Sequence, residues 1–318
     1  MARHRTLISV SSGWGASDMG TGAGPLVITH SINPIQATNK RFDQTFFDRC
    51  HHIENHPAGI PEPRLSFTPN NTNFRHNNAV SAIKQTYDRV LSTLKDNSFP
   101  FVLGGDHSIA VGTWSALKTH LNQDFGLIWI DAHLDAHTPD TSPSQARHGM
   151  PLAALLGYGD AELITLGSNV PKLKPENIVI MGARSFEEGE FELLTRLNVR
   201  IMHMDEIFHR GFDTCFQEAL TLVTSGNKAF GVSFDIDGFD ASIVPGTGTP
   251  EPGGLDETIL VTLNNLLNHD KLVAFELVEF NPRKDKNSAT LKLIWKLVST
   301  LEGAKQWTTV PQQKLHHQ

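Results

Sequence analysis

The stretch FGLIWIDAHLDAH, residues 125 to 137, joins a short apolar run to two aspartates and two histidines. The apolar residues are continuous rather than alternating, which predicts a strand buried on both faces, as in a parallel sheet. The polar residues that follow are costly to bury unless they have partners. The stretch therefore predicts a buried strand whose carboxyl end carries a chemical site.

The same alternation of short apolar runs and amphipathic segments continues along the chain. Strands are predicted at 6–11, 99–105, 125–131, 177–183, 199–204, 229–235 and 272–280. Helical periodicity lies between them at 79–97, 109–121, 187–198, 213–225, 256–268 and 288–303. This order predicts an open α/β sheet with helices on both faces. We find no repeat and no clear linker, so we expect one domain over residues 1–318.

The composition restricts the class of partner and the compartment. The formal net charge is −7, which argues against a nucleic-acid or anionic-membrane partner but does not disfavour small cationic substrates. Two cysteines lie far apart and read as reduced thiols. There is no signal-peptide pattern and no run of ~20 apolar residues. We expect a cytoplasmic protein.

Histidine is abundant, with 16 residues, and many of these lie outside any periodic element. His51, His52 and His56 fall in the stretch CHHIENH, inside a polar segment from about 40 to 78. A metal site there is conceivable, but no periodic element holds these side chains. We interpret the segment as a solvated loop.

Acids and imidazoles gather directly after four of the predicted strands. The stretches are GGDHS (104–108), DAHLDAH (131–137), DIDGFD (235–240) and EFNP (279–282). In open α/β sheets, ligands bind beyond the carboxyl ends of the strands. The four stretches therefore predict one site at that edge.

Six of these side chains form a predicted metal-ligand set. Alternate residues of an extended segment point the same way, and Gly104 and Gly105 permit a close backbone approach. The set is His107, Asp131, His133, Asp135, Asp235 and Asp237. Four gathered carboxylates repel one another unless cations neutralise them, so two divalent ions are predicted. An oxygen-rich set with some imidazole favours Mn²⁺.

The motifs GGDHS, DAHLDAHTP (131–139) and SFDIDGFD (233–240) together resemble the signatures of the ureohydrolases, the arginase and agmatinase family. GTGTPEPGGL (246–255) and EFNP extend the resemblance. It implies a three-layer αβα fold with a mostly parallel sheet of about eight strands. It also implies two Mn²⁺ ions held by the same six residues, assembly as a homotrimer or homohexamer, and hydrolysis of a guanidinium group to urea.

Three further roles follow from the chemistry of that reaction and from the resemblance. A pair of metal ions lowers the pKa of a shared water towards ~7, and the hydroxide would attack the guanidinium carbon. Asp135 would orient this hydroxide. Glu279 in EFNP would pair with the cationic guanidinium, and His148 in ARHGMP would transfer a proton to the leaving amine.

The run from 137 to 157 resembles arginases more than agmatinases and predicts conversion of L-arginine to L-ornithine and urea. Ser142 and Ser144 match hydroxyls that bind the substrate carboxylate, and Glu187 matches the acid that binds its amino group. His137 and Ala146 stand where arginases usually have asparagine. His137 can still donate to a carboxylate and is predicted to bind the substrate, whereas Ala146 cannot make the amide contact. These differences leave open another guanidino or formimino substrate: agmatine, a guanidino acid or formiminoglutamate.

Two other classes of protein, a deacetylase and a binding protein without activity, fit the sequence less well. Deacetylases share this kind of fold but need a tyrosine that stabilises the oxyanion, and the chain has only Tyr87 and Tyr158. A binding protein without activity would be expected to lack a metal ligand, and none of the six is missing. Both observations favour a hydrolase.

Overall fold

The computed structural model describes residues 4–31, 51–54 and 72–303. Within these residues, eight strands form one sheet in the order β2-β1-β3-β8-β7-β4-β5-β6, and every neighbouring pair is parallel. The strands are β1 Arg5–Ser11, β2 His51–Glu54, β3 Phe99–Gly104, β4 Gly126–Ile130, β5 Ile178–Ala183, β6 Arg200–His203, β7 Phe230–Asp235 and β8 Leu272–Val278. The predicted parallel sheet of about eight strands and all seven predicted strands are confirmed.

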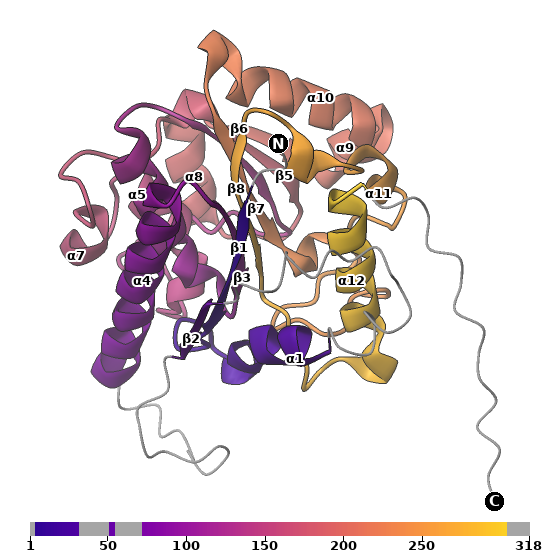
Figure 1. Ribbon diagram of the computed structural model, residues 1–318, viewed down its shortest axis with the longest axis horizontal. Coiled ribbons are helices and arrows are strands. Elements are labelled where there is room, and N and C mark those ends of the chain that lie inside the picture. Colours follow the sequence, from indigo (N-terminus) through magenta and orange to yellow (C-terminus); the bar gives the residue numbers. More distant parts are fainter. Residues whose placement is uncertain (1–3, 32–50, 55–71, 304–318) are drawn as a thin grey trace, which may run out of the picture.

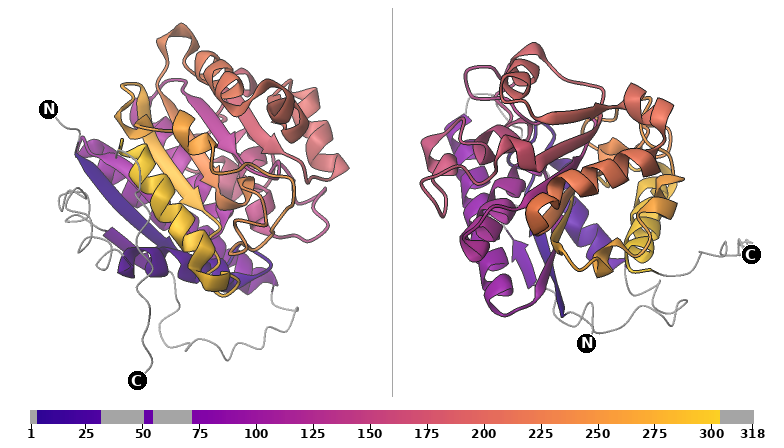
Figure 2. Two further views of the ribbon diagram at one scale, coloured as in Figure 1. Left: turned by 90° about the vertical axis from the view of Figure 1, so that its right-hand side faces the viewer. Right: turned by 90° about the horizontal axis from the view of Figure 1, so that it is seen from above.

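Helices cover both faces of the sheet, which gives three layers (Figures 1 and 2). On one face lie α1 Gly24–His30, α9 Met204–Arg210, α10 Phe212–Val223, α11 Ile259–Thr262 and α12 Ala289–Leu301. On the other lie α4 Thr72–Lys95, α5 Ala110–Leu121, α6 Pro151–Leu155, α7 Ala161–Ile164 and α8 Glu188–Arg196. Short 3-10 turns are η1 Met19–Ala23, η2 His107–Ile109, η3 Arg147–Gly149, η4 Pro175–Asn177, η5 Ser225–Asn227, η6 Ile236–Gly238, η7 Leu266–Asn268 and η8 Lys286–Ser288.

Strand β4 shows why the apolar runs are continuous. Ile128 and Ile130 pack into the core beneath α10 and α12, whereas Leu127 and Trp129 pack into the core beneath α4 and α5. Successive side chains of a strand point to opposite faces, and both faces here are covered, so every position is apolar.

The order of the strands places the predicted site. β3, β8, β7 and β4 are neighbours at the centre of the sheet. These are the strands followed by the four stretches of acids and imidazoles. Because all of them run parallel, their carboxyl ends lie along one edge. Segments separated by more than a hundred residues in sequence therefore meet there.

Two expectations were wrong in detail. Residues 51–54, predicted to be loop, form the edge strand β2, in which His51 pairs with Ile8 of β1. The free edge of β1 offers backbone hydrogen bonds whatever the side chains of the added strand are. His56 and the rest of the segment up to residue 71 lie outside the described residues. The predicted helix 256–268 is interrupted, because Asn265 adopts a left-handed conformation between α11 and η7.

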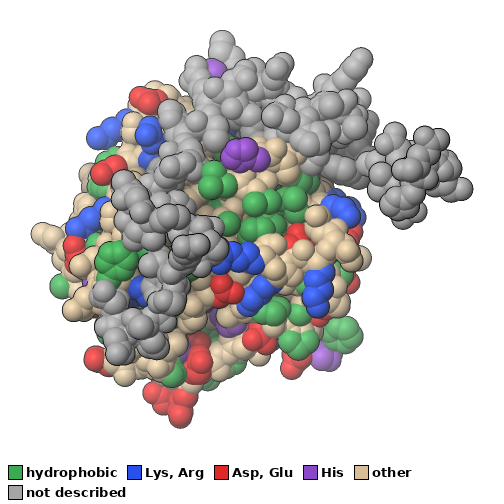
Figure 3. Space-filling view, turned by 90° about the horizontal axis from the view of Figure 1, so that it is seen from below, with side chains coloured by type: hydrophobic (Ala, Val, Ile, Leu, Met, Phe, Trp, Pro, Cys, Tyr) green, Lys and Arg blue, Asp and Glu red, His purple; other side chains and the backbone are tan. Residues whose placement is uncertain are grey.

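Two surface findings agree with the composition. On the face in Figure 3, the acidic, basic and apolar side chains of the described residues are interspersed. Among the described residues, no helix combines the length and the hydrophobicity that a membrane crossing requires.

Candidate functional site

The turn after β3 is built around glycine and a capping aspartate. A Cβ on Gly105 would lie 1.9 Å from the carbonyl oxygen of Ser12, so only glycine allows this approach. Asp106 accepts hydrogen bonds from the backbone N–H groups of Ser108, at 3.0 Å, and Gly15, at 2.9 Å. It caps η2 and thereby fixes His107 at the edge of the sheet. The predicted close approach at this glycine is confirmed.

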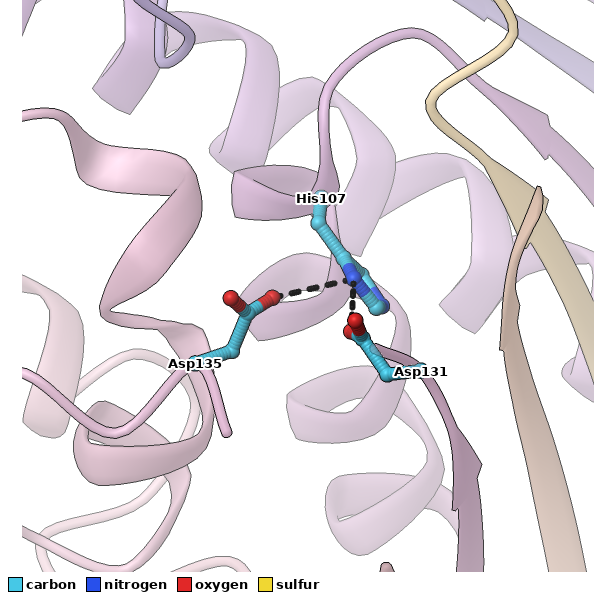
Figure 4. Close-up of side chains that lie close together, drawn as sticks. All are labelled: His107, Asp131 and Asp135. Carbon is cyan, nitrogen blue, oxygen red and sulfur yellow. Dashed lines mark ion pairs between the residues drawn. The ribbon is translucent and has the colours of Figure 1, made fainter. Parts of the chain in front are cut away.

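His107 is directed at three carboxylates. Its buried Nδ1 lies 3.2 Å from Asp131, 3.0 Å from Asp135 and 3.2 Å from Asp235. Figure 4 shows the imidazole between the first two of these. The Nδ1 nevertheless makes no hydrogen bond with any described residue. A buried nitrogen without a hydrogen bond, facing three carboxylate oxygens, matches a site for a cation.

The other ring nitrogen of His107 fixes its tautomer. Nε2 lies 2.8 Å from the hydroxyl of Ser233, and this hydroxyl donates to Glu276 Oε1 at 2.8 Å. Since the serine proton goes to the glutamate, its oxygen accepts from Nε2–H. The lone pair of His107 is therefore on Nδ1, as a metal ligand requires. The ring also stacks on Trp129, with centroids 4.1 Å apart.

A second group of ligand atoms shares Asp131 with the first. The Nδ1 of His133 lies 3.4 Å from Oδ1 of Asp131 and 3.3 Å from Oδ2 of Asp237. The other oxygen of Asp131, Oδ2, faces His107. His107, Asp131 and Asp135 have the proximity expected of ligands to one ion, and so do Asp131, His133 and Asp237. The structure thus brings together all six side chains predicted as metal ligands, in two groups bridged by Asp131.

Alternation along an extended segment does not by itself account for this convergence. β4 ends at Ile130, so Asp131 to Asp135 is not a regular extended segment. Asp135 has φ of 49°, in the left-handed region, and this bend turns its carboxylate towards His107. Glu279 is also left-handed, with φ of 67°. Such conformations are strained in non-glycine residues and cluster at functional sites.

The pKa values of the clustered carboxyl groups show that they repel one another. Burial and the charge of Asp131 raise the pKa of Asp135 to about 6. Burial and the charge of Asp237 raise the pKa of Asp235 well above its usual range. Repulsion among these acids is what bound divalent ions would relieve, so the residues present fit divalent metal binding.

Glu279 and His148, predicted to have separate roles, are in contact. The Nδ1 of His148 lies 3.0 Å from Oε1 of Glu279, and the same oxygen accepts the backbone N–H of His107 at 2.8 Å. The other oxygen of Glu279, Oε2, is buried and has no hydrogen-bond partner among the described residues. Although burial opposes it, the charge of Glu279 raises the pKa of His148 to about 9.

A cavity of about 330 Å³, here named the first cavity, is lined by His148 and by the predicted metal ligands His133, Asp135 and Asp235. Its walls include His137, Ser142, Ser144 and Glu187, which are the four predicted substrate-binding residues. His137 is bonded through Nε2 to Glu187, at 2.9 Å, and through Nδ1 to Thr141, at 3.1 Å. Both of its ring nitrogens are therefore engaged by the protein. The contacts of these four residues with a substrate stay predictions.

Three residues that were not predicted as site residues also line this cavity: Glu190, Thr249 and Glu251. Burial raises the pKa of Glu190 to about 8. Thr249 donates to Oδ2 of Asp237 at 2.9 Å. Glu190 follows Glu187 at the spacing of a helix capping box, and the structure contains this capping box. The spacing could therefore have predicted that Glu190 lies close to Glu187. Thr249 and Glu251 lie in a loop, where no periodic pattern could have pointed to them.

Arg184 and Glu276 were also not predicted, and both hold parts of the site in place through hydrogen bonds. Arg184 donates to the carbonyl oxygens of Asp237, Phe239 and Glu251, at 2.7, 3.0 and 2.9 Å, and so ties two loops together. Glu276 is fully buried within β8. A lone acid inside the apolar run LVAFELV was the signal that could have identified it.

Comparison with known proteins agrees with this geometry. The family model described as the Arginase family matches residues 5–302. The chain belongs to the arginase family. An arginase of Brevibacillus brevis is 34% identical over 306 residues, which cover 96% of this chain and 99% of that relative. An arginase of Bacillus subtilis strain 168 is 37% identical over 230 residues, covering 72% of this chain and 77% of the relative.

Solved arginase structures share the fold. The crystal structure of an arginase from Bacillus cereus superposes with a TM-score of 0.82 at 30% identity, covering 96% of this chain and all of that chain. The αβα architecture expected of the arginase family is confirmed, and the chain is an enzyme of the amidinohydrolase class.

Neither tyrosine lines the first cavity. Tyr87 bonds to Thr119 at 3.2 Å, and Tyr158 packs against the core. The deacetylase alternative therefore lacks its oxyanion-stabilising group at this site.

Proposed function

We propose that this member of the arginase family hydrolyses the guanidinium group of L-arginine to L-ornithine and urea, with two Mn²⁺ ions. The observation that carries the proposal is the convergence of His107 Nδ1 with the carboxylates of Asp131, Asp135 and Asp235, beside a buried carboxylate oxygen of Glu279 that lacks a partner. The first feature fits a divalent cation, and the second fits a guanidinium.

His107, Asp135 and Asp235 would hold one ion, His133 and Asp237 would contribute to the other, and Asp131 would bridge them. When bound, the ions would supply the nucleophile by lowering the pKa of a water molecule. The oxygen-rich ligand set with two imidazoles favours Mn²⁺ among the common divalent ions.

Glu279 would orient the substrate. Its Oε1 is held by His107 N–H and by His148, so Oε2 is left to accept from the guanidinium. A buried carboxylate pairs strongly with a planar cation that presents N–H groups in a fixed fork. This pairing would place the guanidinium carbon in front of the metal ligands.

His148 would return the proton. Its raised pKa keeps it protonated at neutral pH, and its Nδ1 is held by Glu279. The Nε2–H is then the group available to the leaving nitrogen, which must gain a proton before the amine departs. Asp135, which lines the same cavity, would accept a hydrogen bond from the attacking water.

The specific substrate has a second candidate. His137 has both ring nitrogens bonded to protein, and Ala146 offers no amide, so two of the expected contacts to an α-carboxylate are missing. Glu187, Glu190 and Glu251 give the cavity an acidic wall. These features favour another guanidino or formimino compound, such as agmatine, a guanidino acid or formiminoglutamate.

Urea release by the Mn²⁺-loaded protein tests the proposal. L-arginine, agmatine, guanidino acids and formiminoglutamate are compared at equal metal occupancy, with formamide measured for the last. The Asp131→Asn variant is expected to be inactive. Asp205→Asn, an exposed change in α9, serves as the control with unchanged activity. A fully loaded protein that hydrolyses none of these compounds contradicts the proposal.

Assembly and compartment are part of the same proposal. We expect a homotrimer or homohexamer in the cytoplasm, and light scattering of the purified protein tests the assembly.

A further inference from the structure

A second cavity, of about 510 Å³, adjoins the first. Ser17, Ser144 and Ala146 line both cavities, so the two meet at three small residues. Ala146 is the residue that replaces an asparagine usual in arginases. A side chain of one carbon leaves more of the junction open than an amide side chain would.

The two cavities differ in the ionisable residues that line them. The described lining of the first cavity includes five acidic residues, three histidines and no lysine or arginine; the acids are Asp135, Glu187, Glu190, Asp235 and Glu251. The described lining of the second includes Arg75, His76 and Arg147 and no aspartate or glutamate. A ligand that spans the junction therefore passes from an acidic to a basic environment.

The basic groups of the second cavity are held in place by the protein. Arg75 donates to the carbonyl oxygen of Ala16, beside the shared Ser17. Arg147 pairs with Asp160, which fixes its side chain and offsets part of its charge. The Nδ1 of His76 is shielded from solvent and has no hydrogen-bond partner in the described part of the chain. A shielded polar atom of this kind is costly unless a ligand or water satisfies it.

We propose that the second cavity is an anion subsite of the active site and binds the carboxylate at the far end of a guanidino substrate. This inference rests on the proposed function, because it assumes that the guanidinium of the same molecule lies against Glu279. Glu187 and Glu251, which are not among the predicted metal ligands, would repel a carboxylate that stayed beside them. Arg75 would attract a carboxylate that crossed Ser144 and Ala146, and a protonated Nδ1 of His76 would donate a hydrogen bond to it. The subsite would also admit guanidino acids longer than arginine.

Steady-state kinetics of urea release test the subsite. The Mn²⁺-loaded protein is given ω-guanidino acids of increasing chain length, each paired with the alkylguanidine of equal length that ends in a methyl group. We expect the carboxylate to raise kcat/KM about 10-fold or more at the length that reaches Arg75 and His76, as charged hydrogen bonds imply.

Variants assign this gain to the second cavity. Arg75→Gln and His76→Gln are each expected to remove the gain while urea release from the methyl-ended partner is kept. Ala146→Asn, which narrows the junction, is expected to remove it for the longer acids only. Arg210→Gln is the matched surface control, since this arginine lies in α9 and lines neither cavity. If the carboxylate raises kcat/KM by the same factor in the native protein, in Arg75→Gln and in His76→Gln, the proposal is overturned.

A binding measurement separates this proposal from the proposed function. Calorimetric titration of the Asp131→Asn variant with the same pairs reports affinity without turnover. Suppose that the native Mn²⁺-loaded protein releases urea from none of the guanidines, but that the acids still bind Asp131→Asn more tightly than their methyl-ended partners do. If Arg75→Gln abolishes this difference in affinity, the proposed reaction fails and the anion subsite stands. If the carboxylate has no effect on binding, or its effect is independent of Arg75 and His76, the subsite is refuted.

Discussion

The Nδ1 of His148 lies 3.0 Å from Oε1 of Glu279, although 131 residues separate them in the chain. The contact joins the proposed proton donor to the proposed guanidinium binder. The charge that would attract the substrate also keeps the imidazole protonated. The two functions therefore depend on one ion pair.

The first prediction concerns this pair and pH. The folded pKa of His148, about 9, is above the ordinary value of 6.5. For a raised imidazole pKa, the stabilisation is complete below pH 6.5 and is lost as the pH rises through about 9. We expect NMR titration to give His148 a pKa near 9 in the native protein and a lower one in Glu279→Gln. An unshifted value in the native protein contradicts the prediction.

The second prediction concerns Glu279 as a binder of cations. Glu279→Gln preserves the shape of the side chain but removes its charge, so we expect kcat/KM to fall by roughly 100-fold or more, as loss of a buried charge partner implies. Glu192→Gln, an exposed change in α8, is the control. A loss below tenfold would mean that the guanidinium does not depend on this carboxylate.

The third prediction concerns metal and stability. Because a ligand that binds only the folded state stabilises it, removal of metal with a chelator should lower Tm, and Mn²⁺ should restore it. In Asp235→Asn we expect the metal content per chain to fall and the Mn²⁺-dependent rise in Tm to shrink. The same rise in the variant and in the native protein would show that Asp235 holds no ion.

The fourth prediction concerns the hydrogen bonds behind His107. Ser233 and Glu276 hold its Nε2–H and so keep Nδ1 free for a metal ion. Ser233→Ala is expected to weaken metal binding by roughly 10- to 100-fold, as is typical of groups that orient a ligand. Ser299→Ala, which removes a buried hydroxyl in α12, is the control for the loss of a buried serine. Equal metal affinity in both variants argues against this role.

The fifth prediction concerns Gly105 and stability. A methyl group on this residue would press on the carbonyl oxygen of Ser12, so Gly105→Ala should lower the free energy of unfolding by about 2 kcal/mol or more. Gly149→Ala is the control, because its Cβ would find His137 at 3.9 Å. Urea denaturation with both variants measures the difference, and equal stability would show that the turn can shift to accommodate a side chain.

Much of the fold could be predicted because both faces of the sheet are buried. Continuous apolar runs such as 125–130 have no other stable placement in a chain that also carries amphipathic helices. The strand β2 could not be predicted, since its pairing depends on the backbone edge of β1 and not on its own side chains. The helix 256–268 was overpredicted, because periodicity does not register the left-handed Asn265.

The metal-ligand candidates could be predicted because they follow strands in short, dense motifs. Their division into two groups bridged by Asp131 could not, since it depends on the turn at Asp135. The acidic wall formed with Glu190 and Glu251, and the basic cavity beside it, arise from segments that only the folded chain brings together.

The left-handed backbone of Asp135 and Glu279 has a consequence for evolution. Each such residue costs about 1–3 kcal/mol, and glycine would adopt the same conformation without that cost. Glycine would also remove the carboxylate, and with it the ion pair of Glu279 with His148 and the contact of Asp135 with His107. The backbone cost at these two positions is therefore carried together with the acid, and a lineage that no longer needs the reaction is where we expect both acids to be lost.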